Sequence, residues 1–133
     1  MSEPGGVLLD THAFVWLATD QPKLSARARS TALNTANTLH LSVASVWEMA
    51  IKKSLGRFEL KMPLGEFVRG QLVDLDANLV DVRLQHALIV EDLPLHHRDP
   101  FDRLLIAQAI QENFAVLSAD ASLDAYGVKR IWD

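Results

Sequence analysis

The sequence predicts an α/β protein whose mainly parallel sheet is covered by helices on both faces. Short runs rich in aliphatic residues, each of strand length, occur at residues 7–9, 39–41, 78–82, 115–117 and 128–132. Segments whose apolar residues repeat at helical spacing separate the first four runs. Strands that alternate with helices favour parallel pairing, because each helix carries the chain back to the edge where the next strand begins.

The first half of the chain contains two of these runs and four helical segments. A Gly-Gly pair leads into the first run, which ends at Asp10. Ser25 is a good N-cap for the second helix, and Gly56 suits the end of the third. The helices expected here cover residues 11–18, 24–37, 42 or 43 to 55, and 63–72.

The second half adds a helix at residues 84–93 and then the segment HHRDPFDRLLIAQAI at residues 96–110. Asp99 suits an N-cap, Pro100 suits the first helical position, and Asp102 falls where a capping-box acid would lie. Apolar residues then continue at helical spacing. Helix initiation alone therefore explains both aspartates. Whether Asp99 or Asp102 also has a catalytic or binding role depends on where the other acids of the chain lie.

Composition predicts a single globular domain over residues 1–133. Apolar residues make up 49% and charged residues 23% of the chain, which excludes disorder. The chain has no cysteine, which excludes disulfides and thiolate metal sites and makes a cytoplasmic location the expectation. No apolar run approaches the roughly 18 residues that span a bilayer. The net charge of −4 disfavours bulk electrostatic binding of nucleic acid, so a polyanionic partner requires a local basic patch or a bound cation.

Four acids fall where the ends of the predicted strands meet. Asp10 directly follows the first strand, and Asp120 comes three residues after the fourth. Asp102 lies in the first turn of the helix that leads into the fourth strand, and such a helix begins at the same edge of the sheet. Glu48 lies about two turns into a helix that also begins there. Ligands bind at this carboxyl edge of open parallel sheets, so we expect the four side chains to converge.

Converging carboxylates have to be neutralised. At about 4 Å and an effective dielectric constant near 20, two carboxylates repel each other by roughly 4 kcal/mol. Either some of them stay protonated or a divalent cation binds. Carboxylate oxygens and water are the ligands that Mg²⁺ and Mn²⁺ take in proteins. A cation of this kind is also the usual means of hydrolysing a phosphodiester without a protein nucleophile.

Four segments of the chain resemble, in order and spacing, the PIN-domain ribonucleases. They are LLDTHAFVWL, SVASVWEMAIKKSLGRFEL, HHRDPFDRLLIAQAI and LSADASLDAYGVKRIW, and the match runs from residue 7 to residue 132. The likeness is greatest to the VapC-type toxins of bacterial toxin–antitoxin pairs. It implies a three-layer α/β/α sandwich around a parallel five-stranded sheet and metal-dependent endonucleolytic cleavage of RNA. It also implies a homodimer and a cognate antitoxin protein that covers the site.

The resemblance assigns the catalytic, metal-binding set to Asp10, Glu48, Asp102 and Asp120, with Mg²⁺ as the cofactor and Mn²⁺ as the alternative. Glu48 lies in the helical setting VWEMAIK, and Asp102 begins a helix of the D-x-L-x-x-A type. Asp120 belongs to a T/S-x-D turn in which this chain carries Ser118.

Four further residues are candidates for contacts with the substrate or for orienting the metal ligands. Thr11 and Ser118 are expected to orient carboxylates or a bound water. Asp99 belongs to a D-P-F-D form found in one branch of the family, and we assign it to helix capping first. Arg103 directly follows Asp102 and is the first candidate for a phosphate contact, although basic side chains usually form a solvated surface.

Simpler interpretations accompany two of these assignments. Lys52 lies four residues after Glu48 and offers an ordinary helical ion pair, although the apolar neighbours of Glu48 favour a carboxylate that points into a cleft. His96 and His97 suggest a zinc site together with Asp99. We disfavour zinc because adjacent histidines rarely bind one metal ion.

Three other functions remain as alternatives. A nuclease of RNA processing, rather than of growth arrest, would carry the same residues. A phosphohydrolase of small substrates is disfavoured, because a nucleophilic aspartate typically occurs as D-x-D where this chain has Asp10-Thr11-His12. A non-catalytic module that binds a metal or a partner is the third alternative. It has no support from a missing acid, since all four are present.

Overall fold

The computed structural model describes residues 5–133 and contains a five-stranded sheet in which every pair of neighbouring strands is parallel. The strand order is β3-β2-β1-β4-β5. The strands are β1 (Val7–Leu9), β2 (Leu39–Ser42), β3 (Asn78–Val80), β4 (Ala115–Leu117) and β5 (Arg130–Ile131). The direction of strand order reverses between β1 and β4, so a crevice for a ligand is expected beyond the carboxyl ends of these two strands.

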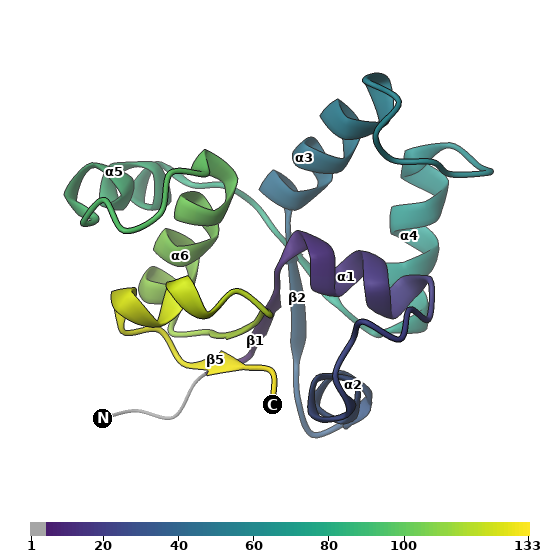
Figure 1. Cartoon of the computed structure of the whole chain (residues 1–133), viewed down its shortest axis with the longest axis horizontal. Coiled ribbons are helices and arrows are strands. Elements are labelled where there is room, and N and C mark those ends of the chain that lie inside the picture. The colour runs from purple at the N-terminus through teal and green to yellow at the C-terminus, as the bar shows by residue number, and fades with distance from the viewer. Residues whose placement is uncertain (1–4) are drawn as a thin grey trace.

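Helices cover both faces of the sheet, as Figure 1 shows. One face carries α1 (Thr11–Ala18), α2 (Ala26–Leu33), α3 (Val43–Ser54) and α4 (Leu64–Asp74). The other carries α6 (Pro100–Glu112), with α5 (Leu84–Asp92) packed on it, and the short 3₁₀ helix η1 (Ala121–Tyr126). This arrangement confirms the predicted α/β fold with a parallel five-stranded sheet. Among the described residues, no helix combines the length and the apolar character needed to cross a membrane.

Alternation along the central strands divides the core into two clusters. Leu9, Leu41 and Leu117 point to the α1–α4 side, where Phe14 and Met49 complete the packing. Leu8 and Val116 point to the opposite side, against α6 and η1. Successive side chains of a strand face opposite sides of the sheet, so a strand buried on both faces is apolar throughout, as β1 and β4 are. The four-residue strand β2 follows the same pattern except at His40, which stacks on Phe114, and at Ser42, which caps α3.

The second helix is shorter than predicted. We expected it to cover residues 24–37, but α2 ends at Leu33. Asn34 leaves the helical conformation, and its side chain accepts a hydrogen bond from the backbone N–H of Ala36 (3.0 Å). The side chain of Asn37 donates to the carbonyl of Thr31 (2.9 Å). Asparagine side chains compete with the helical backbone in this way, and the resulting turn brings the chain to β2.

Two further differences concern the C-terminal part. The helix η1 was not predicted. It begins where the Asp120 carboxylate accepts a hydrogen bond from the backbone N–H of Ser122. The last strand pairs only at Arg130 and Ile131, not over residues 128–132. The start of α6 agrees with the prediction, with Asp99 as N-cap and Pro100 in the first turn. Residues 1–4 of the expected domain lie outside the described residues.

Candidate functional site

The four predicted acids all lie at the carboxyl edge of the sheet, near the reversal of strand order. Asp10 follows β1 and caps α1, whereas Asp120 follows β4 and caps η1. Glu48 lies in the second turn of α3, and Asp102 lies in the first turn of α6. These elements are distant in sequence, and the strand pairing β2-β1-β4 brings them to one rim.

Asp10 is a buried carboxyl group held by local hydrogen bonds. Only 7% of the residue is exposed. Its Oδ1 accepts the backbone N–H of Ala13 (2.7 Å), and the hydroxyl of Ser118 also forms a hydrogen bond with it. Burial raises the pKa of Asp10 and outweighs these hydrogen bonds, and the nearby charge of Glu48 raises it slightly further. A cation beside Asp10 would relieve the cost of ionising it.

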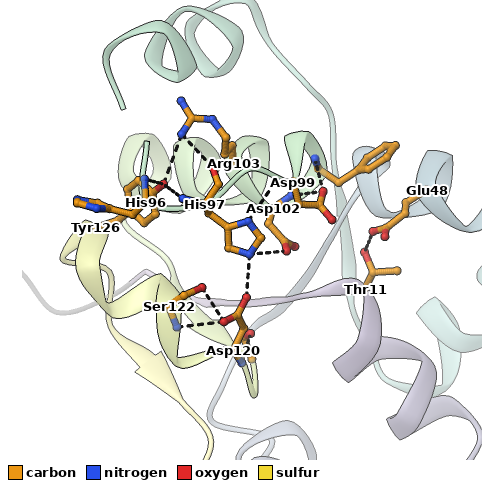
Figure 2. A network of polar contacts seen from close by, with 12 residues as sticks. Thr11, Glu48, His96, His97, Asp99, Asp102, Arg103, Asp120, Ser122 and Tyr126 are labelled. Carbon is orange, nitrogen blue, oxygen red and sulfur yellow. Dashed lines mark hydrogen bonds and ion pairs between the residues drawn. The ribbon is translucent and has the colours of Figure 1, made fainter. Parts of the chain in front are cut away.

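Glu48 is buried as well, with 6% of the residue exposed. Its Oε1 accepts a hydrogen bond from the Thr11 hydroxyl (2.7 Å), and its Oε2 lies 2.8 Å from Nζ of Lys52. The ion pair expected from the i,i+4 spacing is therefore present. The carboxylate nevertheless points inward to Thr11 at the start of α1, as Figure 2 shows.

Asp102 and Asp120 meet at a third side chain, the imidazole of His97 (Figure 2). Its Nε2 lies 2.8 Å from Oδ2 of Asp120 and 3.2 Å from Oδ2 of Asp102. Burial, helped by the charge of Asp99, raises the pKa of Asp102 to about 7. The charges of Asp10 and Glu48 act in the same direction, whereas His97 opposes them. The two buried acids therefore lie close enough to act electrostatically on Asp102.

The pKa of Asp120 is shifted in the opposite direction to that of Asp102. The Asp120 carboxylate accepts hydrogen bonds from the backbone N–H (3.0 Å) and the hydroxyl (2.6 Å) of Ser122, in addition to its contact with His97. Partial burial alone would raise the pKa of Asp120, but the hydrogen bonds from Ser122 and His97 outweigh it and lower that pKa. Asp120 therefore stays ionised where Asp102 is half protonated near neutral pH.

The capping box predicted for Asp102 is replaced by another contact. Asp99 caps α6 as expected, since its Oδ1 accepts the N–H groups of Phe101 (2.8 Å) and Asp102 (3.3 Å). The backbone N–H of Asp99, which a capping-box acid at position 102 would bind, donates instead to Nδ1 of His97 (3.1 Å). The Asp102 carboxylate is thereby left to face the rim.

The structure arranges the four predicted acids in two groups, one of which also contains His97. Within the part of the chain that is described, His97, Asp102 and Asp120 form the one group of three whose candidate metal-ligand atoms all lie within 4.8 Å of one another. Asp10 and Glu48 line the same rim and act on Asp102 through their charge. Oxygen atoms of several carboxylates suit a hard divalent cation, and the pKa values of Asp10 and Asp102 are raised mainly by burial and further by neighbouring carboxylates.

Sequence reasoning missed His97 as a member of this group. The zinc interpretation grouped it with His96 and Asp99, but the ring of His96 packs edge-on against Tyr126 instead (5.2 Å between ring centroids). One signal in the sequence could have found it. His97 comes two residues before the N-cap Asp99, and from there its ring can accept a hydrogen bond from a backbone N–H at the start of the helix.

Arg103 is engaged by the loop that carries His97. Its guanidinium donates to the carbonyl oxygens of Val90 (3.1 Å), Leu93 (3.3 Å) and Pro94 (3.0 Å). It therefore ties the end of α5 to α6, a role that its position next to Asp102 did not suggest. A phosphate contact by Arg103 stays a prediction.

The fold and the rim define an open parallel α/β protein with a carboxylate site suited to a divalent cation. A family model for the PIN domain matches residues 7–129, and the chain belongs to this family. No curated protein matches the sequence. The predicted resemblance is thus confirmed for the family and for the fold.

Solved structures of toxin–antitoxin complexes share this fold. The chain aligns with VapBC2 of Rickettsia felis bound to a promoter DNA fragment, with a TM-score of 0.70 and 16% identity over 96% of this chain and 98% of the other. FitAcB of Neisseria gonorrhoeae aligns with a TM-score of 0.65 and 18% identity over 94% and 96% of the two chains. VapBC-1 of nontypeable Haemophilus influenzae aligns with a TM-score of 0.61 and 17% identity over the same shares.

Proposed function

We propose that this protein is a metal-dependent RNA endonuclease that acts as the toxin of a toxin–antitoxin pair. One observation carries the proposal: a PIN domain places four acids from four separate elements at one carboxyl rim. No nucleophilic cysteine is present in the chain, and metal-assisted hydrolysis requires none.

The residues that would hold the cation are Asp10, Glu48, Asp102 and Asp120. Mg²⁺ is the expected ion and Mn²⁺ the alternative, because every candidate ligand in this set is a carboxylate oxygen. When bound, such an ion polarises the phosphodiester and compensates the negative charge that develops during cleavage. The chain itself fixes the ligands: Thr11 orients Glu48, and Ser118 orients Asp10, through the hydrogen bonds described above.

A cognate antitoxin is the proposed partner. The similar solved structures are VapBC and FitAB complexes, some of them bound to DNA. A groove of about 300 Å³ beside Glu48 supports the proposal. Its lining is half apolar (Ile51, Leu55, Pro100 and Phe101) and half charged (Glu48, Lys52, Arg57 and Asp99). Trp47 in α3 and Leu55 at the C-cap of α3 are 60% and 61% exposed. We expect an antitoxin segment to cover the apolar residues of this groove and to extend a basic side chain to the acids. A homodimer is proposed on the family resemblance alone.

The decisive experiment uses the full chain, freed of any co-purified partner, on total RNA with Mg²⁺, Mn²⁺ or EDTA. Cleavage is expected with either metal and not with EDTA. Asp10→Asn, which retains the cap on α1, should lower the rate at least about 100-fold, because it removes one of the four carboxylates that would hold the cation. Asp20→Asn is the matched control, because Asp20 is an exposed acid paired with Arg29. An active Asp10→Asn protein would refute the proposal.

The biological role needs a second measurement. Induced expression of the wild-type protein should arrest growth, and co-expression of the gene next to it should restore growth if that gene encodes the antitoxin. Sequencing of RNA ends after induction, with Asp10→Asn as reference, identifies the RNA that is cut. Cleavage without growth arrest would support RNA processing instead of toxicity.

A further inference from the structure

We propose that His97 is the positioning residue of this site: its Nε2–H orients the carboxylates of Asp102 and Asp120 for the metal without itself binding the metal. The inference rests on the proposed function, in that it takes the acidic rim to be a divalent-cation site. It assigns a role to a side chain outside the four-acid set.

The tautomer of His97 follows from its backbone neighbour. The Asp99 N–H donates to Nδ1 of His97 (3.1 Å), so Nδ1 presents a lone pair. A neutral imidazole carries one N–H, which therefore lies on Nε2. That nitrogen is the one facing the two acids (Figure 2). The helix start thus directs a hydrogen-bond donor into the rim.

The distances show what this donor does. Nε2 lies 2.8 Å from Oδ2 of Asp120 and 3.2 Å from Oδ2 of Asp102, so Asp120 is the nearer acceptor. Both carboxylates turn one oxygen to the same point. With bonds of 2.0–2.1 Å, opposite ligands of an octahedral Mg²⁺ lie about 4 Å apart. The candidate ligand oxygens of Asp102 and Asp120 lie within 4.8 Å of each other, so a small movement of these two carboxylates would let both reach one ion.

Direct binding of the metal by His97 is disfavoured by the same hydrogen bond. A neutral histidine that binds a metal through Nε2 carries its proton on Nδ1 and donates it to an acceptor. Here Nδ1 meets a donor, the Asp99 N–H. Coordination through Nε2 would require loss of the only ring proton or of this hydrogen bond. His97 therefore acts through the carboxylates.

The backbone of His97 is anchored from two other elements. The Tyr126 hydroxyl, in η1, accepts the backbone N–H groups of His96 (3.0 Å) and His97 (2.8 Å). The guanidinium of Arg103, in α6, binds carbonyl oxygens of the same loop. Because several hydrogen bonds hold the loop, Nε2–H of His97 has a fixed position and can orient the carboxylates of Asp102 and Asp120. Metal ligands require this kind of support.

The test measures Mn²⁺ and Mg²⁺ binding to the full chain by titration calorimetry. His97→Ala should weaken the affinity by about 10- to 100-fold, the usual effect of losing a partner that orients metal ligands. His97→Gln should retain most of the affinity, because its amide N–H reaches the position of Nε2–H. His96→Ala is the matched control and should bind like wild type, since its ring contacts Tyr126 outside the acidic group.

A spectroscopic measurement on the wild-type protein separates positioning from coordination. With ¹⁵N-labelled histidine and bound Mn²⁺, pulsed EPR should show no directly bound histidine nitrogen, and ¹⁵N NMR with Mg²⁺ should show His97 protonated on Nε2. A directly bound nitrogen would overturn the inference, as would a His97→Ala protein that binds Mn²⁺ like wild type. The proposed function would survive either result. A wild-type protein that takes up no Mn²⁺ would refute both.

Discussion

The two halves of the acidic rim are built in different ways. Asp10 and Glu48 are buried, and residues at the strand ends and in the first turn of α1 hold them. Asp102 and Asp120 are more exposed, with 25% and 40% of their side chains accessible, and the imidazole of a loop residue links them. Packing thus preorganises one half, and a hydrogen-bonded loop preorganises the other. Removal of one charge should therefore have different consequences in the two halves.

The largest contrast is expected between Asp10→Asn and Asp120→Asn in the metal-free protein at pH 7. Burial raises the pKa of Asp10, so removing that charge should stabilise the fold. The lowered pKa of Asp120 shows that the fold stabilises its ionised form. In Asp120→Asn, the amide NH₂ can face Nε2–H of His97, which is also a donor. Asp120→Asn should destabilise by about 1 kcal/mol. Denaturant unfolding measures both changes, and changes of the same sign would contradict the contrast.

Asp102 should make the stability of the metal-free protein fall with pH. Its pKa is 3.8 in an unfolded chain and about 7 in the fold, so within this window the folded protein holds a proton that the unfolded chain has released. Stability is then lost as pH rises from about 4 to 7. The effect is about 2 kcal/mol, below the roughly 4 kcal/mol of a fully buried group, because solvent reaches the carboxyl.

Asp102→Asn provides the comparison for this pH effect. Its melting temperature, followed between pH 4 and pH 8, should decline less steeply than that of the wild type. Equal slopes for the two proteins would mean that Asp102 titrates normally. Addition of Mg²⁺ at pH 7 should raise the melting temperature of the wild type more than that of Asp102→Asn.

Loss of the Tyr126 hydroxyl should weaken only the loop-held half. In Tyr126→Phe, the backbone N–H groups of His96 and His97 lose their acceptor, at a cost of about 1 kcal/mol. Amide hydrogen exchange at these two residues should accelerate, whereas Ala13, whose N–H is bound to Asp10, should exchange as in the wild type. Uniform acceleration across both halves would show that the two are not separate units.

The smallest effect is expected at Lys52. Lys52→Met removes the ion pair with Glu48 but keeps the side chain long and helix-forming. Since Lys52 is partly exposed, the change in unfolding free energy should be no more than about 0.5 kcal/mol. Equilibrium unfolding at low and high salt tests this. A larger loss would mean that Glu48 depends on Lys52 more than on Thr11.

The order of the elements followed from local patterns because burial on both faces leaves a plain signal. The runs at β1 and β4 are apolar throughout, and Ser25 and Asp99 cap the helices that follow them in the way their side chains suggest. The end of α2 and the helix η1 were harder to predict. Both depend on short polar side chains, at Asn34 and Asp120, that choose between the helix and a local turn.

The sequence by itself determined the fold class, the caps of several helices and the gathering of four acids at the carboxyl edge of the sheet. These features depend on the periodicity of side chains and on the direction of parallel strands. Only the tertiary structure decided the partners of those acids. His97 meets Asp120 across 23 positions of the chain, and Thr11 meets Glu48 across 37. Contacts between residues this far apart arise from the packing of whole elements. No local sequence pattern specifies such distances to the few tenths of an ångström that decide whether two side chains form a hydrogen bond.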